Sequence, residues 1–151
     1  MFDNKHLKSI FGLNNKSMAT VKTIYKGDLR TEATHLQSGT KIITDAPTDN
    51  NGKGEAFSPT DLVAAALGSC AMTIMGIVAN RENIDLTGTD FSVVKVMGAE
   101  PRRISEIQVE FNFPELAIDD RQRKLLENAA LTCPVAKSLK EELVQSLRFN
   151  W

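Results

Sequence analysis

The sequence predicts an α/β fold, more narrowly α+β, in which antiparallel sheets surround one long central helix. Three features indicate it: strand-like segments separated by turns before residue 46, an uncharged apolar segment over residues 62–79, and alternating apolar residues after residue 90. With 151 residues, 42% of them apolar and 25% charged, the chain can bury a substantial core. We expect one domain over residues 18–151, preceded by a mobile extension over residues 1–17.

Three strands are expected before the central helix. The turn-forming pairs Gly27–Asp28 and Ser38–Gly39 separate segments rich in apolar and β-branched residues: 19–26, 29–37 and 40–45. Short turns join neighbouring strands in antiparallel pairs, so these strands should form a meander. Residues 46–57 hold Pro, Asp, Asn and Gly with few apolar residues, which is typical of a loop.

The central helix has a recognisable start. Ser58 can cap it, Pro59 takes the first helical position, and Asp61 lies three residues after the cap, as in a capping box. We expect the helix to end near Asn83. Its 18 uncharged residues reach the lower limit for a membrane span, but four of them are Gly, Ser or Thr, which favours a wholly buried protein helix. A helix apolar on nearly all sides needs cover on nearly all sides, which indicates a second helix, for instance from another copy of the chain.

The rest of the chain predicts further strands and two short helices. Strands are expected over residues 91–100 and 103–113, and the second alternates apolar Ile107, Val109, Phe111 and Phe113 with polar residues, so one of its faces is buried. An amphipathic helix should start at Asp119 or Asp120 and end at Leu131. A second helix start follows, with Cys133 as the cap and Pro134 in the first position. Residues 143–151 alternate again and are expected to close a sheet edge.

Charge and cysteine spacing exclude several classes of partner. Eighteen basic and 19 acidic residues leave a net charge of −1, with no dense basic run, so we expect neither nucleic acid nor membrane as a partner. The two cysteines form no CxxC pair, so neither a thioredoxin-like motif nor a zinc site is expected, and no cofactor is predicted. Two cysteines without an export signal indicate a reducing compartment, which we take to be the cytoplasm.

The cysteines are the best candidates for chemistry. On pattern alone, packing in an apolar helix explains Cys70 better than reactivity does. Cys133 is more suggestive, because a helix N-terminus stabilises a thiolate and lowers the pKa of the thiol. His35 is the one well-placed imidazole, since His6 lies in the extension; on a strand it is more often a surface residue, so a Cys–His hydrolytic triad is disfavoured.

The two segments that contain the cysteines resemble those of a known family. The segment FSPTDLVAAALGSCAMTIMGIVA, followed 63 residues after its cysteine by CPVAKSL, is similar to the osmotically inducible protein C and organic hydroperoxide resistance family, written OsmC/Ohr. The likeness extends from about Val21 to Trp151. The form GKGEAFSPTD resembles the general OsmC-like branch more than the hydroperoxide resistance branch.

The resemblance implies both an architecture and a reaction. It implies an intertwined homodimer with active sites at the interface between two chains. It also implies that Cys70 attacks a peroxide and becomes a sulfenic acid, that Cys133 condenses with it to a disulfide, and that an external dithiol, such as a lipoyl-type thiol, reduces this disulfide. Arg30 matches the arginine that activates the attacking cysteine in the family.

One position departs from the pattern. The hydroperoxide resistance branch places a glutamate directly after the helix proline to orient the arginine, but Thr60 stands there in this chain. Asp61 is the carboxylate one residue on, with Glu55 as another candidate. Asp61 has the alternative role of completing the capping box with Ser58.

The expected function is that of a cytoplasmic, homodimeric, cysteine-based peroxidase for organic hydroperoxides, with fatty or bulky alkyl groups preferred over hydrogen peroxide. One alternative is a non-catalytic OsmC-like protein that binds a small apolar ligand or serves another stress-related role. The other is a structural domain whose two cysteines are merely packed.

Overall fold

A computed structural model of the chain describes residues 19–151, which form two compact units divided between Thr44 and Asp45. The expected extension over residues 1–17, with His6, lies outside the described residues. That both units belong to one domain stays a prediction.

The first unit is the expected three-stranded meander. Its strands are β1 (Val21–Gly27), β2 (Arg30–His35) and β3 (Lys41–Asp45), in the order β1–β2–β3. β1 pairs antiparallel with β2, and β2 contacts β3 through hydrogen bonds at both ends, from the His35 N–H to Thr40 and between the Thr31 and Thr44 hydroxyls. The turn between β1 and β2 has left-handed backbone at three successive residues, 27–29, and begins with a glycine, which adopts this conformation at little cost.

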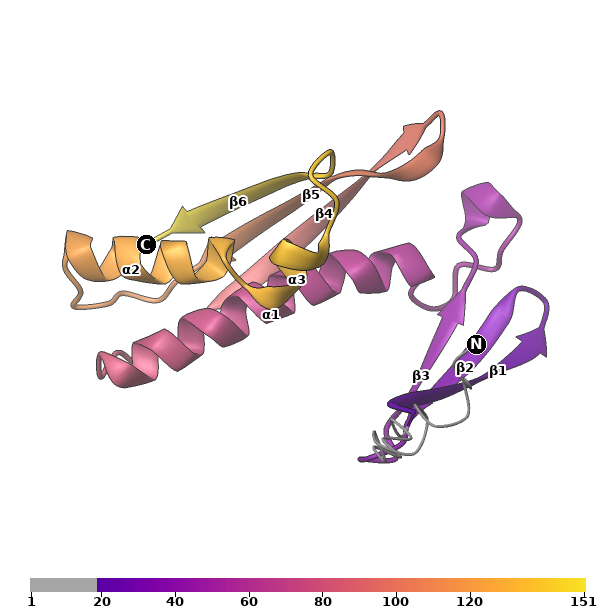
Figure 1. Ribbon diagram of the computed structural model, residues 1–151, viewed down its shortest axis with the longest axis horizontal. Helices are drawn as coiled ribbons and strands as arrows, with labels where there is room; N and C mark the ends of the chain where they lie inside the picture. The colour runs from indigo at the N-terminus through magenta and orange to yellow at the C-terminus, as the bar shows by residue number, and fades with distance from the viewer. Residues whose placement is uncertain (1–18) are drawn as a thin grey trace, which may run out of the picture. The chain divides into compact units, whose positions relative to one another are not determined.

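The second unit contains the remaining elements (Figure 1). After the loop, which includes a short 3-10 turn, η1 (Thr48–Asn50), the elements in chain order are α1 (Pro59–Arg81), β4 (Asp90–Ala99), β5 (Arg102–Asn112), α2 (Asp120–Leu131), α3 (Pro134–Ser138) and β6 (Val144–Asn150). Every element expected after residue 46 is therefore present, with bounds that differ by one to a few residues.

The sheet of the second unit is mixed, which corrects the expectation of antiparallel sheets. Its order is β4–β5–β6, and β4 pairs antiparallel with β5, but β6 runs parallel to β5 from Glu106 opposite Val144 to Asn112 opposite Asn150. α2 and α3 lie between β5 and β6 in the chain, and a helical crossover returns the chain to the same end of the sheet, which makes the two strands parallel. β6 lies at the edge, as predicted.

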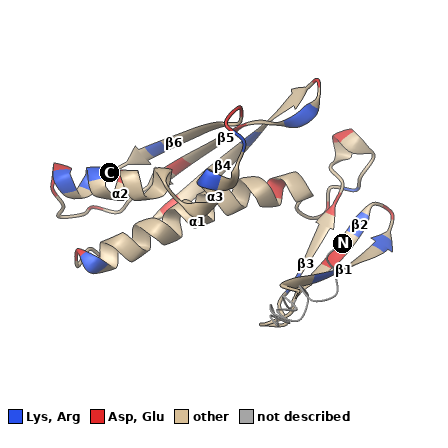
Figure 2. Ribbon diagram, viewed as in Figure 1, with Lys and Arg blue, Asp and Glu red and all other residues tan. Residues whose placement is uncertain are grey.

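α1 begins as predicted. Ser58 accepts a hydrogen bond from the Asp61 N–H at 3.1 Å, and the Asp61 carboxylate accepts one from the Ser58 N–H at 2.7 Å, so the capping box is complete. The helix ends at Arg81, two residues before the expected end, because Asn83 has left-handed backbone (φ 56°) that no helix can include. Only Asp61 and Arg81 carry charges on this helix, so Figure 2 shows it tan between its ends.

The core lies between α1, α2 and one face of the β4–β5–β6 sheet. Leu67, Ala71 and Met75 of α1 are fully buried, as are Leu126 of α2 and, on β5, Ile107, Val109 and Phe111. The residues between these on β5 face solvent, which confirms the predicted alternation.

α1 is only partly covered within the single chain, which agrees with the expectation that one chain covers one face of this helix. What covers the other face stays a prediction. The length and apolar composition of α1 would suffice for a membrane span. Within the single chain, 33% of its most apolar stretch is buried. One face of α1 packs in the core of the second unit. Val63 and Ile77, on the other side, are 38% and 45% exposed.

α1 approaches the sheet closely at one glycine. A Cβ added to Gly68 would lie 2.7 Å from the Phe91 ring and 3.1 Å from Val93, whereas a Cβ at Gly76, two turns on, would meet nothing within 4 Å. The Phe91 ring cannot easily yield, because it packs against the Phe111 ring with centroids 5.4 Å apart. Gly68 therefore sets the distance between α1 and β4.

These two glycines give a matched test of the packing. We expect Gly68→Ala to lower the free energy of unfolding by about 1–3 kcal/mol through overpacking. Gly76→Ala should raise it by up to about 1 kcal/mol, because alanine favours a helix and the site has room. Urea denaturation measures both, and equal effects of the two substitutions would contradict the close approach at Gly68.

Candidate active site

The fold brings the two cysteines into one apolar cluster. Cys70 lies in the middle of α1 and is half-buried, whereas Cys133 lies between α2 and α3 and is fully buried. Cys133 is part of the core cluster and Cys70 packs against it. Both are free thiols that no bond joins.

Cys133 caps α3 as predicted. Its backbone is extended (φ −63°, ψ 153°), Pro134 occupies the first helical turn, and the sulfur accepts a hydrogen bond from the Ala136 N–H at 3.4 Å. The cap therefore places the thiol at the helix start and turns it inward to the cluster.

The expected depression of the Cys133 pKa is wrong. Burial raises the pKa of this thiol, the neighbouring Cys70 side chain raises it further, and the hydrogen bond from the Ala136 N–H lowers it too little to compensate. α3 has only five residues, so its dipole is small, and no water reaches a thiolate at a fully buried sulfur. Cys133 is held as a protonated thiol.

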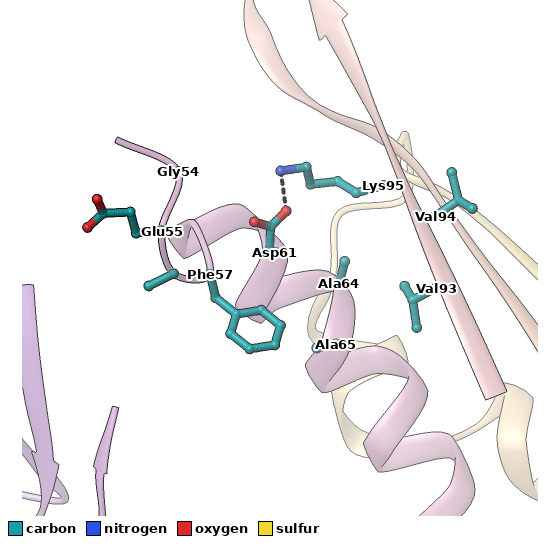
Figure 3. Close-up of a pocket in the computed structure, with 10 residues that line it drawn as sticks. Gly54, Glu55, Phe57, Asp61, Ala64, Ala65, Val93, Val94 and Lys95 are labelled. Atoms are coloured by element: carbon teal, nitrogen blue, oxygen red, sulfur yellow. Dashed lines mark hydrogen bonds and ion pairs between the residues drawn. The ribbon is translucent and has the colours of Figure 1, made fainter. Parts of the chain in front are cut away.

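Asp61 makes an ion pair in addition to the capping box. Its Oδ1 lies 2.6 Å from Nζ of Lys95 on β4, and Figure 3 shows the two side chains pointing toward each other. Burial alone would raise the pKa of Asp61, but the hydrogen bonds from Lys95 and Ser58 outweigh it and lower the pKa.

Lys95 is the site residue that sequence reasoning missed. Its ammonium group also donates to the hydroxyls of Thr60 at 2.8 Å and Ser58 at 3.2 Å, and its side chain is only 17% exposed. A signal was present, because the alternation along β4 places Lys95 on the same inward face as Val93. A lysine on an apolar strand face requires a buried partner.

The other two predicted residues lie outside the helices. Arg30 opens β2 in the first unit, so its role toward Cys70 stays a prediction, and Glu55 lies exposed in the loop before α1. Asp61 stands nine residues before Cys70 on α1, which is about 14 Å along the helix axis. Within one chain, the structure therefore groups the two cysteines and separately groups Asp61 with Lys95.

His35 and possible metal-binding groups were the remaining candidates for other chemistry. The His35 ring bonds the Ser38 hydroxyl at 2.7 Å in an exposed turn, as a surface histidine would. Over residues 19–151, no group of three or more His, Cys, Asp or Glu side chains comes together in a way that could hold a metal ion.

Comparison with known proteins shows a family match for most of the second unit. The profile of the family described as OsmC-like protein matches residues 52–147, which include both cysteines, Asp61 and Lys95. No curated protein sequence matches the chain.

Solved structures resemble the whole described chain. A protein from Psychrobacter arcticus, provisionally described as an osmotic stress induced and detoxification response protein, is 52% identical, with a TM-score of 0.87 and coverage of 91% of this chain and 100% of that one. Two more distant structures share the fold. An organic hydroperoxide resistance protein from Legionella pneumophila is 19% identical (TM-score 0.65; coverage 90% and 100%). A protein from Vibrio cholerae, provisionally described as an organic hydroperoxide resistance protein with captopril bound in one of its active sites, is 16% identical (TM-score 0.68; coverage 91% and 95%).

The Asp61–Lys95 pair predicts an acid-dependent stability. A lowered pKa means that Asp61 stabilises the fold fully above its ordinary pKa of 3.8 and loses this contribution as the pH falls through the folded pKa. The difference in unfolding free energy between the wild type and Asp61→Asn should be constant above about pH 5 and shrink below pH 3.8. In a Lys95→Met background the same substitution should cost less, and full additivity of the two changes would rule out the pair.

Burial of Cys133 predicts a protected thiol. In Cys70→Ser, which leaves Cys133 as the single cysteine, alkylation by iodoacetamide should be slow in the native protein and at least about tenfold faster in denaturing urea. The matched variant Cys133→Ser reports Cys70, whose half-exposed thiol should gain less from urea. Equal native alkylation of the two thiols would contradict the observed difference in burial.

Proposed function

The chain belongs to the OsmC-like protein family, and we propose that it is a thiol-dependent peroxidase that reduces organic hydroperoxides. The observation that carries the proposal is that two free thiols, from segments 63 residues apart in the chain, belong to or pack against one apolar cluster, although they do not form a close pair. The family includes proteins described as organic hydroperoxide resistance proteins, which supports the same reaction.

The bonds that form and break in the reaction involve the two cysteines, the peroxide and a reductant. The Cys70 thiolate attacks the terminal oxygen of the hydroperoxide, the O–O bond breaks, and the alkoxide leaves as an alcohol after taking up a proton. Cys70 becomes a sulfenic acid. The Cys133 thiol then condenses with it, forming the disulfide and releasing water. An external dithiol restores both thiols and is itself oxidised to a disulfide.

The burial of the two thiols supports this division of roles. Cys70 is half-exposed and can be reached by a peroxide, whereas Cys133 is fully buried. The raised pKa of Cys133 keeps it protonated, so it does not compete for the peroxide. It is the better candidate for the resolving cysteine.

Activation of Cys70 requires a cation, because a thiolate in an apolar surrounding is otherwise disfavoured. We assign this role to Arg30. The carboxylate that orients Arg30 is then Asp61 or Glu55, and Asp61 is already hydrogen-bonded to Ser58 and Lys95.

A homodimer is part of the proposal. Val63 and Ile77 leave one face of α1 apolar and exposed, and the first unit exposes apolar side chains as well, among them Ile24, Tyr25 and Ile42 at 53%, 64% and 47%. Apolar surface of this extent is typical of an interface, and a second copy offers the same apolar surfaces in return. A cytoplasmic location and an external dithiol reductant complete the proposal.

Peroxide consumption by single variants tests the proposed reaction. Cys70→Ser should lose at least about 10³-fold of the activity toward cumene hydroperoxide with a dithiol reductant, because the remaining thiol, Cys133, is fully buried and protonated. Cys133→Ser should still form one sulfenic acid per chain, detected by mass after dimedone trapping, but no intramolecular disulfide.

The control is Cys133→Ala, which should behave as Cys133→Ser if only the sulfur matters. Cumene hydroperoxide consumption by Cys70→Ser at the wild-type rate would exclude the peroxidase and favour a non-catalytic, ligand-binding protein.

A further inference from the structure

A cavity of about 630 Å³ opens where the turn between β4 and β5 meets the segment that joins α3 to β6. This volume lies in the range of small-molecule sites, about 300–1,000 Å³. The lining residues come from two stretches of the second unit, 100–104 and 138–143. Each stretch forms one wall of the cavity.

The cavity has an apolar surface that the core supports. Ile104, Leu139 and Leu143 line it, are half-buried and pack against the core cluster of the second unit. Pro101 adds an exposed apolar ring at the turn. Because the core holds the three aliphatic side chains from behind, they offer a stable apolar surface to the body of a ligand.

Each wall also carries one acidic and one basic side chain, all of them exposed. Glu100 and Arg103 belong to the first wall, and Lys140 and Glu142 belong to the second. Among the described residues, none of the four makes an ion pair, and their one side-chain hydrogen bond joins Arg103 Nη1 to the Pro101 carbonyl at 3.4 Å. A guanidinium group has five N–H donors, so most of those of Arg103 remain available. The cavity therefore offers two charges of each sign that can still take partners.

This pattern of charges sets the class of ligand. A ligand body that covers the apolar surface displaces water from the charged groups around it. An uncharged molecule gives those groups nothing in return, and an ion of one sign compensates two of them but repels the other two. A molecule that carries one charge of each sign compensates both kinds of group.

We propose that this cavity binds small zwitterionic molecules with an aliphatic body, such as dipeptides of aliphatic residues. Arg103 receives the carboxylate of the ligand, because a guanidinium can donate two parallel hydrogen bonds to it. Glu100 and Glu142 receive the ammonium group. The aliphatic side chains of the ligand lie on Ile104, Leu139 and Leu143.

The site goes beyond the proposed peroxidase. The described residues that line the cavity include none of those assigned to that reaction. Binding is measured at equilibrium, without peroxide or reductant. A failure to bind would leave the peroxidase intact, and an inactive Cys70 would leave the binding site intact.

The primary experiment titrates the full chain with three dipeptides and follows backbone amide chemical shifts by NMR. The probes are leucyl-leucine, its N-acetyl derivative, which lacks the ammonium, and its C-terminal amide, which lacks the carboxylate. At pH 6.0 the amino terminus, with an ordinary pKa of about 8, is protonated and the carboxyl group is ionised. All three probes have the same aliphatic side chains, so differences in affinity report the charges.

Leucyl-leucine should bind with a dissociation constant of about 1 mM or lower and shift the amide signals of residues 100–104 and 138–143. Each blocked dipeptide should bind at least about threefold more weakly, because it loses one of the two charge contacts. Equal affinities of the three probes, no binding of leucyl-leucine, or shifts confined to other residues would overturn the proposal.

Arg103→Gln tests the carboxylate contact. It should weaken leucyl-leucine and the N-acetyl derivative by at least about threefold and leave the amide within about 1.5-fold, because the amide has no carboxylate to lose. Arg148→Gln is the matched control, since it removes the same charge from an exposed residue of β6 outside the cavity, and it should change none of the three affinities. Equal weakening of all three probes by Arg103→Gln would overturn the proposed contact.

The double variant Glu100→Gln with Glu142→Gln tests the ammonium contact. It should show the converse pattern, with leucyl-leucine and the amide at least about threefold weaker and the N-acetyl derivative no weaker than before. All the substituted residues are exposed, so the variants should keep the unfolding free energy of the wild type within about 0.5 kcal/mol in urea. An unchanged affinity for leucyl-leucine in the double variant would overturn the assignment of the two glutamates.

Discussion

Burial of one face of α1 against the β4–β5–β6 sheet positions every site residue of the second unit. Gly68 lets the helix approach Phe91 and Val93 closely, and the buried residues Leu67, Ala71 and Met75 continue this contact along the helix. Cys70 lies next to this face and is half-buried. The same contact presents the helix start to β4, where Lys95 reaches Ser58, Thr60 and Asp61.

The ion pair at the start of α1 shows how a residue of β4, Lys95, can change the role of a residue of the helix, Asp61. Asp61 could orient an arginine only if its oxygens were available. Here the capping box engages one oxygen and Lys95 engages the other. The ion pair ties α1 to β4, and the charges of the two residues cancel.

Local signals predicted most of the fold. Ser58, Pro59 and Asp61 mark the helix start because capping depends on residues within one turn, and the alternation around Val109 marks β5 because a strand has a period of two. The direction of β6 was not accessible in this way, since parallel or antiparallel pairing depends on the crossover through α2 and α3. The pKa of Cys133 was mispredicted for a related reason: the helix N-terminus is a local feature, whereas burial by the whole core is not.

The sequence by itself determined the elements, the cap of each helix and the family resemblance of the two cysteine motifs, because each of these depends on short segments and their spacing. Only the tertiary structure decided that Cys133 is buried in the cluster against which Cys70 packs, that Lys95 pairs with Asp61, and that α1 keeps one apolar face uncovered in a single chain. These depend on contacts between residues 34 to 63 positions apart, whose distances are set by packing and not by local periodicity.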